Sequence, residues 1–140
     1  MTTIACNRVC MAAERHFSLD GAYFYAPKLW RYKGAIYSSC GSQSDWAQFK
    51  RWLSKRRRGQ PPVFDKESFN VLKLDKKGIW FIDDSGEGTL IDNDYFALGS
   101  GQLGALVALG LGCDPAQAVT ETIRHSEGSG GPVDVMTLGD

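Results

Sequence analysis

Short runs of apolar and β-branched residues, separated by turn-forming residues, make up most of this chain and alternate with a few stretches of helical periodicity. Strands are expected at 2–6, 9–14, 17–25, 34–40, 69–74, 79–83, 89–92 and 133–138. The polar pair at residues 7 and 8 separates the first two and indicates a hairpin. Runs of strands combined with runs of helices are typical of an α+β layered domain.

Three segments show the pattern of helices. In residues 44–58 the apolar positions recur at three-and-four spacing, and Gly59 with the prolines after it ends the pattern. Helices are also expected at 102–111 and at 115–124, where Asp114 serves as the amino-terminal cap of the second. The last expected strand follows this pair of helices.

The length and composition fit one globular domain over residues 1–140. Hydrophobic residues make up 43% of the chain and charged residues 23%, as in ordinary globular proteins. Sixteen basic residues balance sixteen acidic ones, so the overall charge favours neither nucleic acid nor an anionic membrane. We find no signal-peptide pattern and no run of eighteen apolar residues, and we therefore expect a cytoplasmic protein.

The cysteines and histidines do not form a metal-binding pattern. The sequence holds four cysteines without a C-x-x-C pair: Cys6, Cys10, Cys40 and Cys113. Each lies in or beside apolar sequence, which indicates small reduced core residues. His16 and His125 have no ligand spacing with these cysteines or with each other, so we expect no zinc site.

Thr2 directly follows the initiator methionine. Methionine aminopeptidase commonly acts before small side chains, so removal of Met1 would give Thr2 a free α-amine. The pKa of such an amine is about 7.7–8.0, and its neutral form can take the proton from the hydroxyl of the same residue. Thr2 is thus a candidate nucleophile that carries its own base. This signal is weak alone, because many proteins begin with Met-Thr for no catalytic reason.

Further segments extend this start into a longer pattern. They follow residues 2–5 in this order: 11–15, Lys28, 39–45, 97–101 and 129–131. Over nearly the full chain the pattern resembles the proteasome β-subunit and HslV family of N-terminal-nucleophile (Ntn) hydrolases. The Gly-Gly-Pro-Val-Asp run at 130–134 is similar to short members of that family in phage and bacterial genomes.

The resemblance implies an αββα sandwich in which one helical layer is reduced. Family members usually carry a second long helix after the one expected at 44–58. Here residues 59–68 hold two prolines and show no helical periodicity.

The resemblance also assigns catalytic roles. Thr2 matches the nucleophile, and Lys28 matches the lysine whose charge favours a neutral amine and an ionised hydroxyl. Glu14 stands where the family usually has the aspartate that pairs with this lysine. Glutamate is one methylene longer, and the sequence is compatible both with a Glu14 that pairs with Lys28 and with one that does not. Gly41 matches the glycine whose N–H faces the oxyanion, a position that needs close approach of the substrate.

Other matched positions lie around the same site. Ser39 falls at a substrate-pocket position, where a small polar side chain argues against a deep hydrophobic anchor. Ser100 and Ser129 match serines near the α-amine. Ser126 stands where the proteasome has an aspartate, and Glu127 is a candidate substitute.

The function implied is that of a threonine-type peptidase, which forms an acyl-enzyme on Thr2 and needs no metal or organic cofactor. Its substrates would be peptides or unfolded proteins, and an ATPase would be a possible partner. A homo-oligomer is also expected, with a symmetry that the sequence does not specify. Two alternatives stay open: an amidase acting on a small non-peptide substrate, and a non-catalytic structural or assembly protein. The departures at Glu14 and Ser126 favour the second alternative.

Overall fold

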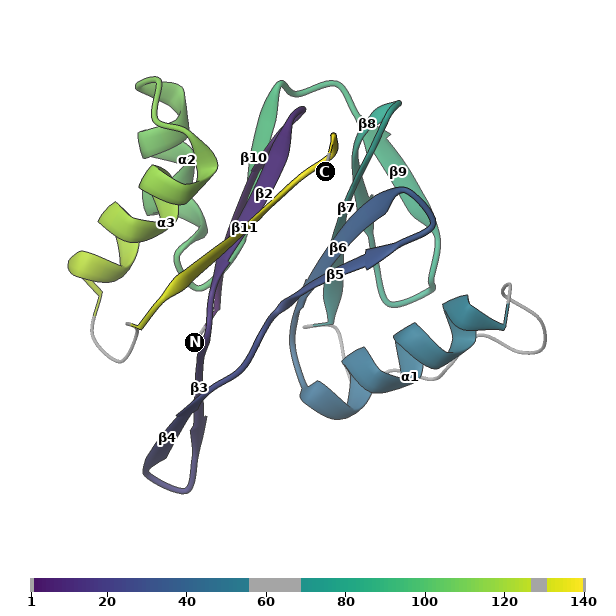
Figure 1. The fold of residues 1–140 in the computed structure, drawn as a ribbon, viewed down its shortest axis with the longest axis horizontal. Coiled ribbons are helices and arrows are strands. Elements are labelled where there is room, and N and C mark those ends of the chain that lie inside the picture. The colour runs from purple at the N-terminus through teal and green to yellow at the C-terminus, as the bar shows by residue number, and fades with distance from the viewer. Residues whose placement is uncertain (1, 56–68, 127–130, 140) are drawn as a thin grey trace.

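The computed structural model describes residues 2–55, 69–126 and 131–139. Two antiparallel β-sheets lie face to face, and helices cover the outer face of each sheet (Figure 1). The chain therefore forms the α+β, αββα sandwich predicted from the sequence. No helix in the described ranges is long and apolar enough to cross a membrane.

The first sheet contains the amino-terminal strands at its centre. Its strand order is β10-β1-β2-β11. The strands are β1 (Thr3–Asn7), β2 (Cys10–Glu14), β10 (Tyr95–Gly99) and β11 (Val133–Thr137). The Asn7 side chain accepts hydrogen bonds from the N–H groups of Val9 and Cys10 and so closes the predicted hairpin between β1 and β2.

The second sheet is a five-stranded antiparallel meander in chain order. It consists of β5 (Leu29–Tyr32), β6 (Ala35–Cys40), β7 (Asn70–Asp75), β8 (Gly78–Ile82) and β9 (Gly88–Ile91). The last three strands confirm those predicted at 69–74, 79–83 and 89–92. β6 ends at Cys40, shortly before the first helix, and this end of the strand borders a pocket that Thr2 also lines.

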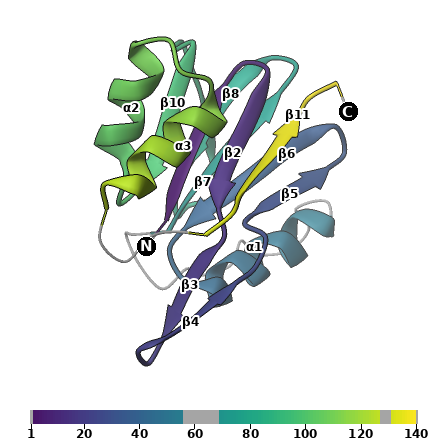
Figure 2. The same ribbon diagram turned by 60° about the vertical axis from the view of Figure 1, so that its left-hand side comes forward.

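The prediction of one strand at 17–25 is wrong. This segment is a separate hairpin of β3 (His16–Leu19) and β4 (Ala22–Tyr25), and it extends away from the sandwich (Figures 1 and 2). Asp20 and Gly21 both have positive φ and form its turn. β5 and β10 are not among the predicted strands, since none was predicted between residues 25 and 34 and residues 97–101 entered only the family pattern.

Among the described residues, three helices complete the layers: α1 (Gln43–Ser54), α2 (Gln102–Gly110) and α3 (Pro115–Arg124). The Asp114 side chain accepts from the N–H of Gln117 while the Gln117 side chain accepts from the N–H of Asp114, which confirms the predicted cap of α3. α1 ends at Ser54, before the predicted end at residue 58. Residues 59–68, where we predicted no second helix, lie outside the described residues, as do residues 56–58 of the first predicted helix.

Alternation along the central strands divides the core into layers. Ile4 and Cys6 of β1 face the second sheet, whereas Ala5 between them faces α2 and α3. Small alanines on this outer face let the two helices approach closely. Phe49 and Trp52 of α1 pack on the other sheet. All four cysteines are free, and burial raises the pKa of the Cys6 thiol.

Candidate active site

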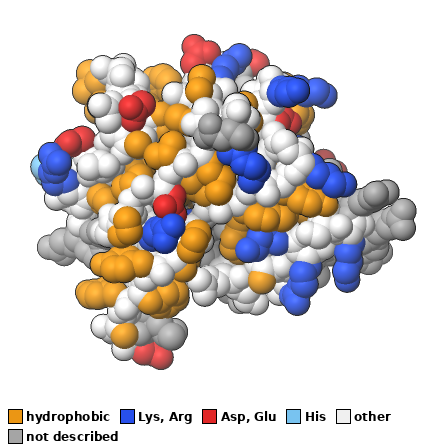
Figure 3. Space-filling model, viewed as in Figure 1, with side chains coloured by type: hydrophobic (Ala, Val, Ile, Leu, Met, Phe, Trp, Pro, Cys, Tyr) orange, Lys and Arg blue, Asp and Glu red, His pale blue; other side chains and the backbone are white. Residues whose placement is uncertain are grey.

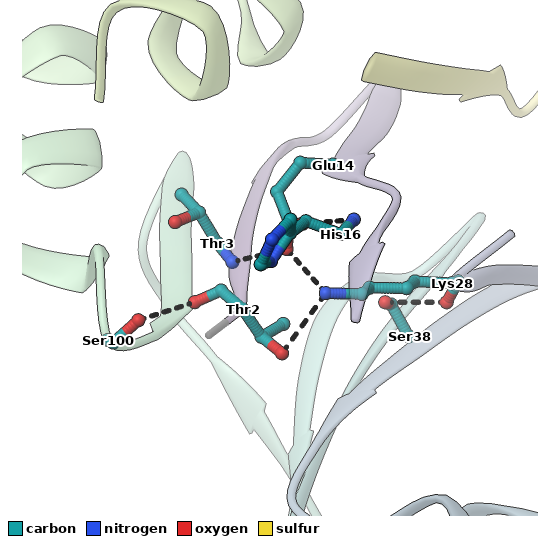
Figure 4. Close-up of polar contacts among 7 residues, drawn as sticks. All are labelled: Thr2, Thr3, Glu14, His16, Lys28, Ser38 and Ser100. Carbon is teal, nitrogen blue, oxygen red and sulfur yellow. Dashed lines mark hydrogen bonds and ion pairs between the residues drawn. The ribbon is translucent and has the colours of Figure 1, made fainter. Parts of the chain in front are cut away.

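A buried ion pair lies between the two sheets, next to Thr2. Glu14 ends β2, and Lys28 directly precedes β5. The Nζ atom of Lys28 lies 2.6 Å from Oε1 of Glu14, and their side chains are 5% and 0% exposed (Figure 4). Glutamate therefore does reach the lysine. Burial lowers the pKa of Lys28, and the hydrogen bond and negative charge of Glu14 oppose this shift.

Thr2 joins this pair through its hydroxyl group. Nζ of Lys28 donates to Oγ1 of Thr2 at 3.4 Å, so one ammonium group contacts both the hydroxyl and the carboxylate (Figure 4). Phe17 covers the ammonium on another side, with its ring centre 4.6 Å from Nζ. A positive charge held beside the hydroxyl favours its ionised form.

Backbone hydrogen bonds fix the carboxylate of Glu14 from two directions. Oε1 accepts from the N–H of Thr3 at 3.0 Å, and Oε2 accepts from the N–H of His16 at 2.7 Å. On the other side of the pair, the hydroxyl of Ser38 donates to the carbonyl oxygen of Lys28 at 2.7 Å. Sequence reasoning missed the N–H groups of Thr3 and His16, because backbone donors leave no residue-type signal.

The turn after β10 positions the main chain of Thr2. The hydroxyl of Ser100 donates to the carbonyl oxygen of Thr2 at 3.3 Å (Figure 4). Gly99 pairs with Thr3 across the sheet at a φ of 98°, and a Cβ atom there would overlap the carbonyl oxygen of Thr2. The turn that carries the predicted Ser100 thus contacts Thr2 directly, and Gly99, to which the sequence assigned no role of its own, is a further element of the site.

Gly41 connects two pockets that both border Thr2. It lies between β6 and α1 with a φ of 121°, a conformation that favours glycine. The first pocket also contains Ser39 and Lys28, and the second contains Ser100. The predicted residues Thr2, Glu14, Lys28, Ser39, Gly41 and Ser100 are therefore gathered in one region.

The remaining predicted residues are Ser126, Glu127 and Ser129. Ser129 and Glu127 lie outside the described residues. The hydroxyl of Ser126 donates to the carbonyl oxygen of Thr122, one turn back in α3. In the described ranges, no three His, Cys, Asp or Glu side chains form a group that could hold a metal ion.

Solved structures with low sequence identity share this architecture. BPH of Thiobacillus denitrificans matches with a TM-score of 0.68 and 18% identity, over 98% of this chain and 97% of its own. HslV of Trypanosoma brucei matches with a TM-score of 0.70 and 19% identity, over 96% of this chain and 98% of its own. The chain has the Ntn-hydrolase fold. A second structure of the Thiobacillus BPH, with a TM-score of 0.66, is in complex with epoxomicin.

A third protein extends the range of these matches. A Gly-1 mutant of Anbu from Hyphomicrobium sp. strain MC1 matches with a TM-score of 0.69 and 14% identity, over 96% of this chain and 80% of its own. No protein-family model and no curated protein matches the sequence. The likeness therefore concerns the fold, and any activity must be argued from the site.

Proposed function

We propose that this chain is a threonine-type peptidase that cleaves peptide bonds through an acyl-enzyme on Thr2, after removal of Met1. The observation that carries this proposal is the position of the Lys28 ammonium, 3.4 Å from Oγ1 of Thr2 and 2.6 Å from Oε1 of Glu14. The fold of HslV and the epoxomicin complex of a structural neighbour support the same chemistry.

In the first step, the neutral α-amine of Thr2 takes the proton of its own hydroxyl. The hydroxyl oxygen then bonds to the carbonyl carbon of the peptide. Lys28 remains protonated through its pairing with Glu14, and its charge stabilises the developing negative charge on Oγ1. The same charge disfavours protonation of the nearby amine.

The attack turns the peptide carbonyl into an oxyanion. The N–H of Gly41 is the proposed donor to it, and one such donor is worth about 10²–10³ in rate. Collapse of the tetrahedral intermediate breaks the C–N bond, and the α-amine passes its proton to the leaving amine. A water molecule then hydrolyses the ester and frees Thr2, with the α-amine again acting as the base.

Hydrolysis of a fluorogenic peptide series tests this function. Thr2→Ala should abolish hydrolysis, whereas Thr2→Ser should keep part of it because serine retains a hydroxyl on the same amine-bearing residue. Both small side chains permit removal of Met1. Cleavage of small amides but not of peptides would favour the amidase, and absence of any hydrolysis would favour a non-catalytic role.

The setting expected from the sequence forms part of this proposal: a cytoplasmic homo-oligomer acting on peptides or unfolded proteins, with an ATPase as partner. Four free thiols support a reducing compartment. Leu103, Val107 and Leu111, spaced by four residues along α2 and its end, are 64–82% exposed and offer an apolar stripe for assembly. Native mass spectrometry of wild type and of Val107→Glu tests the assembly.

A further inference from the structure

We propose that the first pocket beside Thr2 accepts an acidic side chain, aspartate or glutamate, from the residue on the acyl side of the cleaved bond, and that Lys50 determines this preference. The inference rests on the proposed peptidase function and adds a substrate class to it. It concerns a lysine in the third turn of α1 that sequence analysis did not single out.

The position of this pocket suits the acyl side of the substrate. During the reaction the acyl group is bonded to Oγ1 of Thr2. Lys28, whose Nζ lies 3.4 Å from this oxygen, lines the first pocket, whereas the second pocket borders Ser100, which contacts the main chain of Thr2. The first pocket therefore lies nearer the bound acyl group. Its volume of about 250 Å³ suits one side chain rather than a whole ligand.

The charges around this pocket favour an anion. Lys28 and Lys50 both line it, and no carboxylate is present among its described lining residues. Lys28 is already bound to Glu14. Within the described ranges Lys50 forms no ion pair, so its charge can be neutralised by a substrate. Figure 3 shows basic side chains gathered over α1, whereas the acidic side chains visible in the same view lie over other elements.

Aromatic rings hold the Lys50 ammonium near the pocket. Nζ lies 5.2 Å from the ring centre of Trp46 and 6.0 Å from that of Trp30. Contacts of this kind restrict a long side chain that would otherwise sample many rotamers. The rings of Trp46 and Phe17 also line the pocket and can pack against the methylene groups of an aspartate or glutamate.

Neutral donors at the start of α1 complete the anion site. Ser42 is the N-cap and Gln43 the first residue of this 12-residue helix, and both line the pocket together with Ser39. Hydroxyl and amide groups can donate to a carboxylate, and the helix dipole places partial positive charge at this end. Asp45 in the first turn opposes this field, but its side chain is buried and does not line the pocket.

Fluorogenic peptides that differ solely in the acyl-side residue, as glutamate, leucine or lysine, test the preference. For wild type, kcat/KM should be highest for the glutamate peptide. Lys50→Gln should lower the glutamate-to-leucine ratio about tenfold, equivalent to about 1.4 kcal/mol. Lys50→Glu should favour the lysine peptide over the glutamate peptide. The wild-type preference should also weaken at high salt, because the pocket is partly open.

Arg51 provides the matched control. It is the next residue of α1, carries the same charge, is exposed and does not line the pocket. Arg51→Gln and Arg51→Glu should leave the ratios of the three peptides as in wild type. Thermal unfolding of all four variants checks that the helix is intact, and labelling by epoxyketones bearing glutamate or leucine gives a second measure of preference.

The possible failures are distinguishable. If the leucine peptide is cleaved best, Thr2→Ala abolishes this cleavage and Lys50→Glu leaves the ratios unchanged, the pocket inference is overturned while the peptidase function stands. If no peptide is cleaved and neither epoxyketone labels Thr2, the function and the inference fall together. Equal changes of the ratios in the Arg51 variants would overturn the assignment to Lys50.

Discussion

Oε1 of Glu14 lies 2.6 Å from Nζ of Lys28 and 3.0 Å from the backbone N of Thr3. One carboxylate oxygen therefore connects the lysine to the strand that begins immediately after the proposed nucleophile. The pair is buried, so its charges interact in a medium of low dielectric constant. This relationship holds the Lys28 ammonium beside the hydroxyl of Thr2.

Removal of Lys28 should affect both activity and stability. Lys28→Met should lower kcat/KM at least about 100-fold, because the charge beside Oγ1 is lost. It should also lower the free energy of unfolding by about 3–5 kcal/mol, since Glu14 would be left buried without its counter-ion. Peptide hydrolysis and urea unfolding measure the two effects.

The double variant Lys28→Met, Glu14→Gln separates these effects. It should recover much of the lost stability, because no unpaired charge remains, but it should not recover activity. Activity close to wild type in the double variant would show that the pair is merely structural.

The pH dependence of kcat/KM should reflect the titration of Lys28. Burial lowers its pKa below the ordinary 10.5, so the charge is lost at a lower pH than in an exposed lysine. We therefore expect kcat/KM to fall on the alkaline side below pH 10.5. Lys28→Arg should move this alkaline limb upward in whatever activity it retains, because arginine stays protonated. An unchanged alkaline limb would show that another group is responsible.

Stability should respond to the same titration with the opposite sign. Because the folded-state pKa is below the unfolded one, the unfolded chain binds more protons between the two values. The contribution of Lys28 to the free energy of unfolding should therefore rise as pH increases through its folded pKa toward 10.5. Urea unfolding of wild type and Lys28→Met across this range isolates the contribution, and a fall with pH would contradict the assignment.

Alanine variants of two glycines with similar φ angles distinguish backbone strain from steric overlap. Gly99 has a φ of 98° and Gly112 a φ of 100°, but a Cβ atom would overlap Thr2 at the first position and meets nothing within 4 Å at the second. Gly112→Ala should cost about 1–2 kcal/mol from backbone strain alone. Gly99→Ala should cost more and also displace Thr2, lowering activity. Equal losses in thermal stability and full activity in both variants would argue against a positioning role of Gly99.

The layered fold could be predicted where single segments carry their own signal. The helix at 115–124 has its cap and its proline within the sequence, and the meander at 69–92 has clear turns. Segment 17–25 was predicted as one strand because aromatic residues lie on both sides of Asp20 and Gly21. The turn at these two residues was therefore not recognised. β10 was missed because its strand character depends on pairing with β1, 88 or more residues earlier.

The candidate site was predictable through family resemblance rather than through spacing. The register of β1 on β2 brings Thr2 close to Glu14, and Lys28 reaches both from the residue before β5 in the second sheet. The N–H groups of Thr3 and His16, which hold the carboxylate, could not be predicted because every residue except proline carries one. Lys50 was missed because a lysine on an amphipathic helix is ordinarily a solvated residue.

Thr2 can act as an amino-terminal nucleophile only after Met1 is removed, and intact-mass measurement with amino-terminal sequencing tests both points at once. The protein would be measured before and after treatment with epoxomicin, with Thr2→Ala as the control. We predict a mass that lacks methionine and gains one inhibitor at Thr2, with no gain in the control. A chain that retains Met1 and forms no adduct would rule out this role of Thr2 and favour a non-catalytic role on this fold.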